Sequence, residues 1–202
     1  MDLKKLKEPL EIKDIDFRIQ SINKGGYATI LAYKDARVDI NRLNDVCGQL
    51  GWKRKHTRDN KNCIVSIWDD KNKHWVSKED TGTESMAEAA KGLASDSFKR
   101  SCFNWGIGIE LYDYPIISIK LAQCTKDDKG KYKNDGEWYL DENGKPKATF
   151  NLKLRDWVWG SEFEDGKLSK LAVKDTNGKL RFNWKSKWKI DLLIKTFDCE
   201  KG

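Results

Sequence analysis

The strongest constraint on the fold is a segment in the middle of the chain, residues 86–112, which reads MAEAAKGLASDSFKRSCFNWGIGIELY. One face of a helix at about 100° per residue collects small or apolar side chains: Met86, Ala90, Leu93, Ser97 and Ser101. Side chains this small allow a sheet or a neighbouring backbone to approach the helix closely. Gly106 and Gly108 permit backbone angles that other residues avoid, so the helix is predicted to end near Asn104.

An adjacent basic pair, Lys99 and Arg100, lies near the end of this helix. A helix that only fills a core needs no such pair, so the pair indicates that something anionic approaches the backbone. The two side chains point about 100° apart. Both therefore reach one groove only if the helix lies along its wall or floor; otherwise one of them is a solvated residue on the flank.

The residues before this segment alternate between strand and helix patterns. Residues 15–33 predict a β-hairpin, with its turn at Gly25-Gly26. Asp35 offers an N-cap to a helix over 36–50, which Gly51 would end. Three short strands are expected after it, over 52–58, 63–68 and 74–79.

The residues after the segment predict mainly strands and turns. A strand is expected over 114–124 and another over 150–155, and Asn177-Gly178 predicts a hairpin. A closing helix is expected near 186–197. Short D/E/N-G-K elements recur at 128–131, 142–145, 165–167 and 177–179, and we interpret them as turn chemistry.

The expected fold class is therefore α+β with a mainly antiparallel sheet: hairpin, helix, three-strand meander, long helix, further strands. We divide the chain into a core at 1–122, an exposed loop or hairpin at 123–147, and a β-rich extension with the closing helix at 148–202.

Composition limits the environment and the partners. The formal net charge of +7 is compatible with a nucleic-acid partner. No apolar run is long enough to span a membrane and no apolar leader is visible, so we expect no membrane partner and a cytoplasmic location. The 5 cysteines include no C-x-x-C pair, which argues against zinc. No cofactor is predicted.

Three segments in this order resemble a known family: YKDARVDINRLNDVCGQLGWKRKH, then IVSIWDDKNKHWVSKEDTG, then AAKGLASDSFKRSCFNWGIGIELY. They look like the Rad fifty-two type single-strand annealing proteins, especially the bacterial DdrA-like and phage members. The matching portion runs from about Asp16 to Pro115. Past Pro115 the match to the eukaryotic members fades.

The resemblance implies a β-β-β-α core that assembles into a homo-oligomeric ring or helical filament. It implies binding of single-stranded DNA and its pairing with a complementary strand without ATP, in recombination or double-strand break repair. A single-strand binding protein of the phage or its host is a further implied partner. No enzymatic activity is expected.

The resemblance also implies which residues touch DNA. The Lys-Arg pair of the family's helix carries over to Lys99 and Arg100, and the arginine of the D-A-R element carries over to Arg37. Lys91 falls at another basic groove position. This chain has Ile109 where many relatives have arginine, which weakens one expected contact.

Two further basic stretches could touch DNA. In the predicted strand 52–58, alternation places Arg54, with His56 and Arg58, on one face, and Lys53 and Lys55 on the other. One set could form the rim of a groove, or both could be solvated. Residues 184–189, WKSKWK, interleave aromatic and basic side chains, although core packing is the favoured explanation for these tryptophans. Trp157 and Trp159 share one strand face, where burial or a subunit interface is favoured over base stacking.

Three alternatives remain at this point. Asp156 with Asp165-Gly166-Lys167 could mimic a Mg²⁺-dependent nuclease, although an ordinary turn explains the latter. A passive single-strand binder of OB type would protect DNA without annealing it. A scaffold that kept only the fold would not bind DNA at all.

Overall fold

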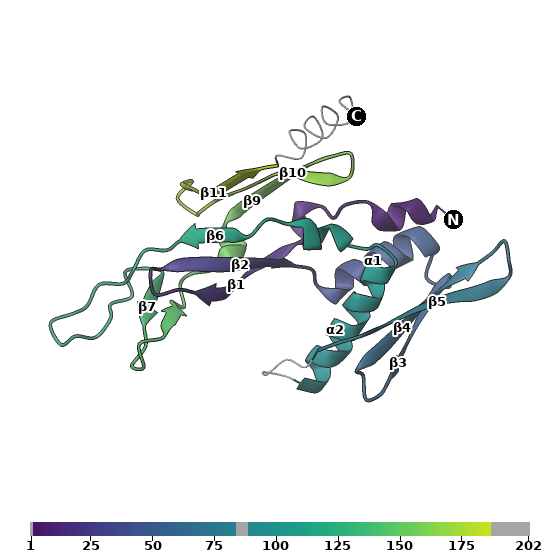
Figure 1. Cartoon of the computed structure of the whole chain (residues 1–202), viewed down its shortest axis with the longest axis horizontal. Coiled ribbons are helices and arrows are strands. Elements are labelled where there is room, and N and C mark those ends of the chain that lie inside the picture. Colours follow the sequence, from purple (N-terminus) through teal and green to yellow (C-terminus); the bar gives the residue numbers. More distant parts are fainter. Residues whose placement is uncertain (1, 84–88, 187–202) are drawn as a thin grey trace, which may run out of the picture. The chain divides into compact units, whose positions relative to one another are not determined.

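The computed structural model describes residues 2–83 and 89–186 and shows an α+β fold with antiparallel sheets (Figure 1). This confirms the predicted fold class. The α-helices in this part of the chain are α1 (Ala36–Cys47) and α2 (Ala89–Asn104). Short 3₁₀ helices are η1 (Leu3–Lys7), η2 (Ile12–Asp14), η3 (Ile109–Asp113) and η4 (Leu154–Asp156). The strands are β1 (Asp16–Ile22), β2 (Tyr27–Tyr33), β3 (Trp52–Thr57), β4 (Asn62–Asp69), β5 (His74–Thr81), β6 (Ile117–Lys120), β7 (Trp138–Leu140), β8 (Pro146–Ala148), β9 (Val158–Glu164), β10 (Lys167–Lys174) and β11 (Leu180–Lys185).

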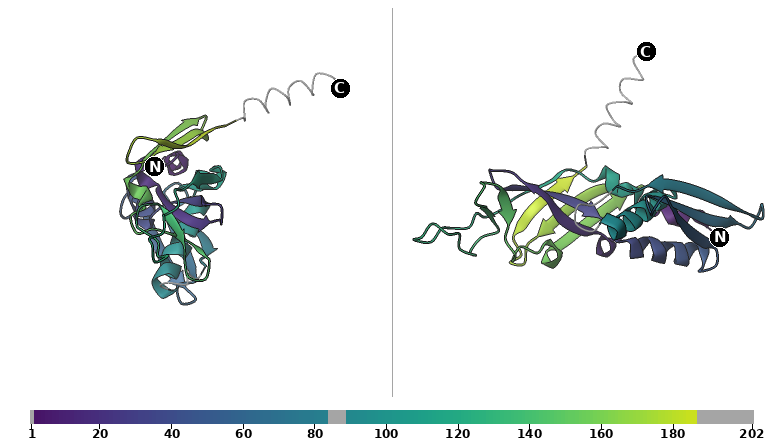
Figure 2. Two further views of the ribbon diagram at one scale, coloured as in Figure 1. Left: turned by 90° about the vertical axis from the view of Figure 1, so that its left-hand side faces the viewer. Right: turned by 90° about the horizontal axis from the view of Figure 1, so that it is seen from below.

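The chain forms two compact units. The first unit contains Met1–Asp16 and Tyr33–Asp113, and the second contains Phe17–Ala32 and Tyr114–Gly202. The β1–β2 hairpin therefore groups with the later strands, whereas the sequence analysis grouped it with the helices. Figure 2 shows the helices and the meander β3–β4–β5 of the first unit, and the strands β9–β11 of the second, from two further sides.

The core of the first unit lies between the meander and the helices. In β4, Cys63, Val65 and Ile67 are buried against α1 and α2, as the predicted alternation requires. The strand order is β3-β4-β5, so β4 is central. The prediction of three antiparallel strands here is confirmed, with β5 two residues longer than expected.

Helix α2 approaches the sheet closely because its inner face is small. Ser97 and Ser101 are fully buried. The Ser97 hydroxyl donates to the Asn60 carbonyl at 2.9 Å, and the Ser101 hydroxyl donates to the Cys63 carbonyl. A Cβ atom at Gly82 would lie 2.6 Å from the Ser97 nitrogen. The predicted close approach is confirmed for these residues, and Met86 falls outside the described part.

Helix α1 begins as predicted and ends earlier. The Asp35 carboxylate accepts from the Arg37 backbone nitrogen at 2.8 Å, which confirms the N-cap. The predicted end at residue 50 is wrong. Gly48 has φ +73° and donates to the Asn44 carbonyl, so the helix stops there, and Leu50 is 94% exposed.

In the second unit the β1–β2 hairpin is completed by a distant strand. The turn forms as predicted, because the Asn23 side-chain oxygen accepts from the backbone nitrogens of Gly25 and Tyr27. β6 pairs antiparallel with β2, placing Ile117 opposite Ile30. The order is β1-β2-β6, which confirms a strand within 114–124.

The other sheet of the second unit has the order β11-β10-β9. The predicted hairpin at Asn177-Gly178 connects β10 and β11. Its turn is built around Asp175, whose carboxylate accepts from the backbone nitrogens of Asn177 and Lys179. Asp127 and Asp141 make the same pair of bonds three residues before Gly130 and Gly144, so these elements are turn chemistry, as expected.

The strand predicted over 150–155 is wrong. The segment forms turns and the 3₁₀ helix η4, and Phe150 is 87% exposed. Of the alternating apolar residues, Leu154 alone is buried. The apolar alternation over 150–155 therefore does not form a strand, because no neighbouring strand in the described part of the chain pairs with it. The closing helix predicted near 186–197 falls almost entirely outside the described residues.

Candidate nucleic-acid interface

The start of α1 presents an exposed cation beside an acidic cap. The Arg37 side chain is 84% exposed, and its Nε donates to the Asp35 carboxylate at 2.8 Å. The hydrogen bonds from Arg37 hold the pKa of Asp35 below its usual value. An exposed ion pair of this kind contributes little to stability, so Arg37 can exchange the carboxylate for a phosphate at low cost.

Lys99 lies on the outer face of α2. It is two residues from both Ser97 and Ser101, which face the sheet, so it points nearly the opposite way. Helices α1 and α2 pack against each other, and the charge of Lys99 contributes to the lowered pKa of Asp35. Lys99 forms no hydrogen bond or ion pair with another residue of the described part. The structure therefore brings Lys99 and Arg37 to one region.

Aromatic rings border this region. Phe103 follows Lys99 by one helical turn, and its ring packs edge-on against Tyr112 with centroids 5.0 Å apart. Tyr112 is 65% exposed. The sequence analysis assigned neither ring to the site. The four-residue spacing from Lys99 to Phe103 was the signal that could have found the first of them. We call Arg37, Lys99, Phe103 and Tyr112 the α1–α2 surface.

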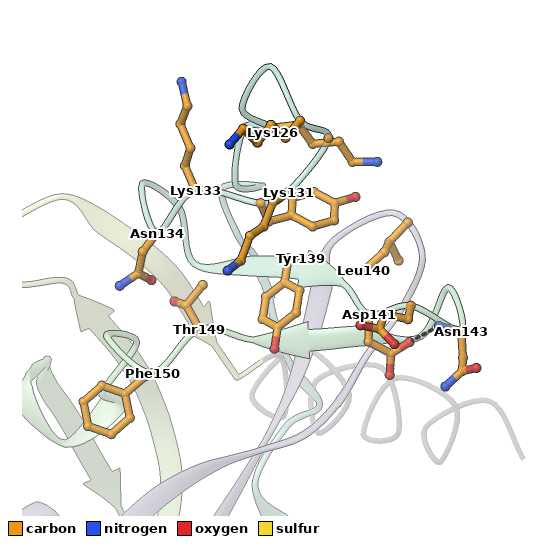
Figure 3. Close-up of a pocket in the computed structure, with 14 residues that line it drawn as sticks. Lys126, Lys131, Lys133, Asn134, Tyr139, Leu140, Asp141, Asn143, Thr149 and Phe150 are labelled. Carbon is orange, nitrogen blue, oxygen red and sulfur yellow. Dashed lines mark hydrogen bonds between the residues drawn. The ribbon is translucent and has the colours of Figure 1, made fainter.

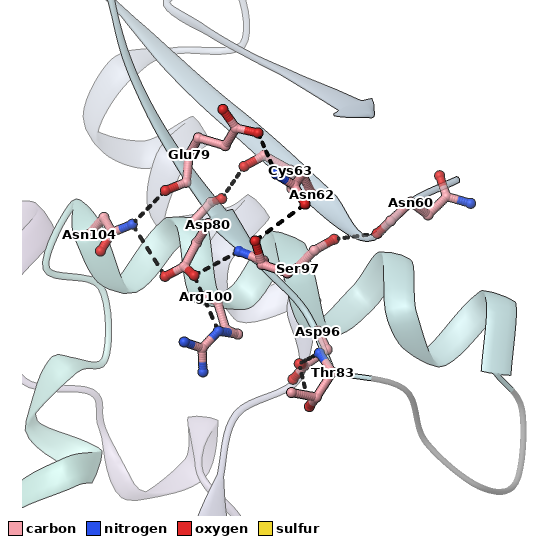
Figure 4. A network of polar contacts seen from close by, with 12 residues as sticks. Asn60, Asn62, Cys63, Glu79, Asp80, Thr83, Asp96, Ser97, Arg100 and Asn104 are labelled. Atoms are coloured by element: carbon pink, nitrogen blue, oxygen red, sulfur yellow. Dashed lines mark hydrogen bonds and ion pairs between the residues drawn. The ribbon is translucent and has the colours of Figure 1, made fainter. Parts of the chain in front are cut away.

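Arg100 points away from this surface. Its Nε lies 3.3 Å from the Asp80 carboxylate of β5, in the network that Figure 4 shows. The Asn104 amide donates to the same carboxylate and to the Glu79 carbonyl. Arg100 therefore helps to attach α2 to β5. The structure separates the adjacent pair because neighbouring helix residues diverge by about 100°.

The basic residues of β3 lie on two faces, as alternation predicts. Arg54 is on the helix side, with its guanidinium 4.6 Å from the centre of the Phe98 ring. Lys53 is on the opposite face, with its Nζ 4.1 Å from the centre of the Trp75 ring, and Lys55 shares that face. All three basic side chains are exposed. Arg58 begins the following turn with φ +50° and does not extend either face.

Two positions named in the sequence analysis add no contact to the α1–α2 surface. Lys91 belongs to α2, but its side chain is outside the description. Ile109, where many of the annealing proteins that the sequence resembles have arginine, is 46% exposed at the start of η3. Trp157 is buried, Trp159 stacks on Phe17 with ring centroids 3.5 Å apart, and Trp184 is half-buried.

A buried ion pair beneath the site was missed by the sequence analysis. Lys34 and Asp39 are 1% and 0% exposed, and Lys34 donates to Asp39 and, at 2.6 Å, to the Ile107 carbonyl. Burial raises the pKa of Asp39 to about 6, although Lys34 opposes the shift. A Cβ at Gly108 would lie 3.0 Å from the Lys34 side chain. The pair thus attaches the GIG turn to α1. The turn needs glycine because Gly106 and Gly108 have φ +94° and +73°, which other residues rarely adopt.

The alternative sites lack a comparable arrangement. Among residues 2–83 and 89–186, no group of three or more His, Cys, Asp or Glu side chains could hold a metal ion. Asp156 lies in η4, and Asp165-Gly166 form the tight turn between β9 and β10. No helix of the described chain is long and apolar enough to cross a membrane.

Comparison with protein-family models and with curated proteins finds no match to this chain. The resemblance to the single-strand annealing proteins therefore stays a prediction, and the functional argument depends on the residues themselves.

Proposed function

We propose that the protein binds single-stranded DNA and anneals complementary strands without ATP, as a homo-oligomer. The observation that carries the proposal is that Arg37 and Lys99 lie on one surface, beside the exposed ring of Tyr112. Cations that have no strong internal partner are available to phosphates, and a neighbouring aromatic ring can contact a base. The D-A-R and SDSFKR motifs that supply these residues are the ones that resemble the annealing family.

The few basic side chains of one subunit suit weak contacts with DNA phosphates that are repeated along an oligomer. Each phosphate that a Lys or Arg neutralises releases counterions, and on single strands it adds about −0.7 to the log–log dependence of affinity on salt. One subunit with a few such contacts binds weakly. Several subunits on one strand bind much more tightly, because each further contact becomes intramolecular. Oligomerisation therefore belongs to the proposal.

The experiment that tests the proposal mixes two complementary labelled oligonucleotides without nucleotide cofactor and follows their pairing rate. The unmodified protein should accelerate pairing. The double variant Arg37→Ala with Lys99→Ala should bind single strands at least about tenfold more weakly, and lose a salt slope of roughly 1.4 for two contacts. Lys73→Ala is the matched control, because Lys73 is also exposed and paired only with Asp70 at the β4–β5 turn.

The outcomes separate the candidate functions. Tight binding without faster pairing would indicate a passive single-strand binder. Unchanged binding by the double variant would refute the assignment to the α1–α2 surface. A protein that neither binds nor pairs oligonucleotides at low salt would contradict the proposal as a whole.

A further inference from the structure

The second unit contains a cavity that the proposed function does not use. It lies between the loop that carries Lys126–Lys133 and the β7–β8 hairpin, and has a volume of about 1060 Å³ (Figure 3). Its lining combines four lysines with three aromatic rings: Lys126, Lys129, Lys131, Lys133, Tyr132, Tyr139 and Phe150. We call it the β7–β8 cavity.

Two rings of this cavity lie beside ammonium groups, because the Lys126 Nζ is 4.8 Å from the centre of the Tyr132 ring and the Lys153 Nζ is 5.5 Å from the centre of the Phe150 ring. Phe150 is 87% exposed, and in Figure 3 its ring projects from the chain directly after Thr149. The rings of Tyr132 and Tyr139 are half-buried, with centroids 5.8 Å apart and planes tilted by 48°. Exposed rings beside cations are the combination on which nucleic-acid bases stack.

The charge of the lining is also available. The four lysines are exposed and form no ion pair with any side chain in the described ranges. The carboxylates of the neighbouring aspartates accept hydrogen bonds from backbone nitrogens. Asp127 and Asp141 accept from turn nitrogens, and Asp135 accepts from Thr125 at 2.9 Å. Glu142 is the exposed acid of the lining. With four lysines against Asp141 and Glu142, the lining carries a net positive charge.

The frame of the cavity is already formed. Thr149 is buried, and its backbone nitrogen and hydroxyl donate to the Glu137 and Gly136 carbonyls at 2.9 and 3.0 Å. On its other side Gly136 lets the chain at Cys124 approach, since a Cβ there would lie 2.6 Å from the Cys124 nitrogen. Phe150 thus projects from a fixed position. Because such a site is already ordered, ligand binding costs little conformational entropy.

We infer that the β7–β8 cavity binds a segment of single-stranded nucleic acid, with phosphates on its lysines and a base stacked on Phe150. The inference goes beyond the proposed function and does not depend on it, because the cavity would hold a strand whether or not pairing follows. An acidic peptide would use the lysines but would gain nothing comparable from the rings. The lining therefore favours a strand that carries both phosphates and bases.

The test uses the full chain carrying Arg37→Ala and Lys99→Ala, which removes the proposed contacts of the first unit. Binding of labelled oligo-dT is measured by fluorescence anisotropy over a range of salt. Adding Phe150→Ala to this double variant should weaken its binding of oligo-dT about tenfold, which is the effect expected from losing one base stacked on an aromatic ring. It should leave binding of an abasic oligonucleotide unchanged.

Two charge variants complete the test. Lys131→Gln with Lys133→Gln should weaken binding of both oligonucleotides and reduce the salt slope by about 1.4. The matched control is Lys174→Gln with Lys179→Gln, which removes two exposed lysines of the second unit outside the cavity, and it should change neither quantity.

Several results would overturn the inference. These are no oligo-dT binding by the Arg37/Lys99 background, no effect of Phe150→Ala, an equal loss in the lysine control, or tighter binding of an acidic phosphopeptide than of oligo-dT. None of them changes whether the unmodified protein accelerates pairing in the annealing assay. Failure of this inference and failure of the proposed function are therefore distinguishable.

Discussion

Lys34 and Asp39 show, at the scale of single residues, how a buried ionisable group makes the stability of the fold depend on pH. Asp39 has its pKa raised from 3.8 to about 6 by burial. Between these values the folded state holds a proton that the unfolded state has released. Stability therefore falls as the pH rises through this window, and the contribution is at its lowest above about pH 6.

The first prediction concerns Asp39→Asn, which cannot ionise. Its stability relative to the unmodified protein should rise by roughly 3 kcal/mol at most between pH 4 and pH 7, because only the unmodified protein carries the Asp39 titration. Denaturant unfolding at a series of pH values measures this. A difference between the two proteins that does not change with pH would show that folding does not raise the pKa of Asp39.

The second prediction concerns Gly82, where the end of β5 meets α2. A Cβ there would lie 2.6 Å from the Ser97 nitrogen and 2.9 Å from the Leu93 carbonyl oxygen, both backbone atoms of the helix. Gly82→Ala should therefore destabilise the fold by about 1–3 kcal/mol. Gly160→Ala is the control, because nothing lies within 4 Å of its Cβ position. Thermal unfolding of both variants should separate them; equal values would mean that α2 shifts freely.

At the scale of elements, local patterns predicted those features that depend on local chemistry. The Asn23 turn, the Asp35 cap and the alternation of β4 each depend on a few neighbouring residues, and each is confirmed. The strand over 150–155 is wrong because its apolar alternation has no partner strand. Sequence neighbours cannot reveal whether such a partner exists.

The third prediction concerns Arg181, which connects β11 to the rest of the second unit. Its guanidinium donates to both Glu137 oxygens at 2.8 Å, to Asp175 at 3.0 Å and to the Lys120 carbonyl. Its side chain is 10% exposed. These bonds outweigh burial and lower the pKa of Glu137 and of Asp175. Removing Arg181 would leave two carboxylates without their partner.

Arg181→Met should accordingly cost about 3–5 kcal/mol. Arg181→Lys should recover only part of the loss, because an ammonium group cannot make the two parallel bonds to Glu137. The exposed pair Lys170–Glu162 supplies the control: Lys170→Met should change the free energy of unfolding by less than about 1 kcal/mol. If Arg181→Met were as mild as the control, the network would not stabilise the unit.

At the scale of the whole molecule, the candidate site was only partly predictable. Arg37 and Lys99 were selected by motif, and the structure brings them together. Arg100, adjacent to Lys99 in sequence, faces β5 because of the helical twist, which a motif does not record. Lys34 carries no signal of its burial, since a lysine between a strand and an acidic cap is ordinarily exposed.

The fourth prediction follows from the proposed assembly. The solution mass should be a multiple of the 23.4 kDa chain, with or without single-stranded DNA. Sedimentation or light scattering at several concentrations measures it. The Arg37→Ala and Lys99→Ala variant should keep the same mass, since these side chains are assigned to DNA and not to the assembly. A monomer under all conditions would refute the oligomer and, with it, the avidity argument.

The pairing of β2 with β6 has a consequence for how the chain is made. On the ribosome β2 emerges early, but its neighbour begins at Ile117, opposite Ile30, after the whole of Tyr33–Asp113 has been synthesised. At about 5–20 residues per second, this delay is roughly 4 to 17 s. During that time one edge of the nascent hairpin has no partner, and an unpaired edge is open to wrong pairing with other chains. The speed of translation through Tyr33–Asp113 thus sets how long the nascent chain is exposed to aggregation.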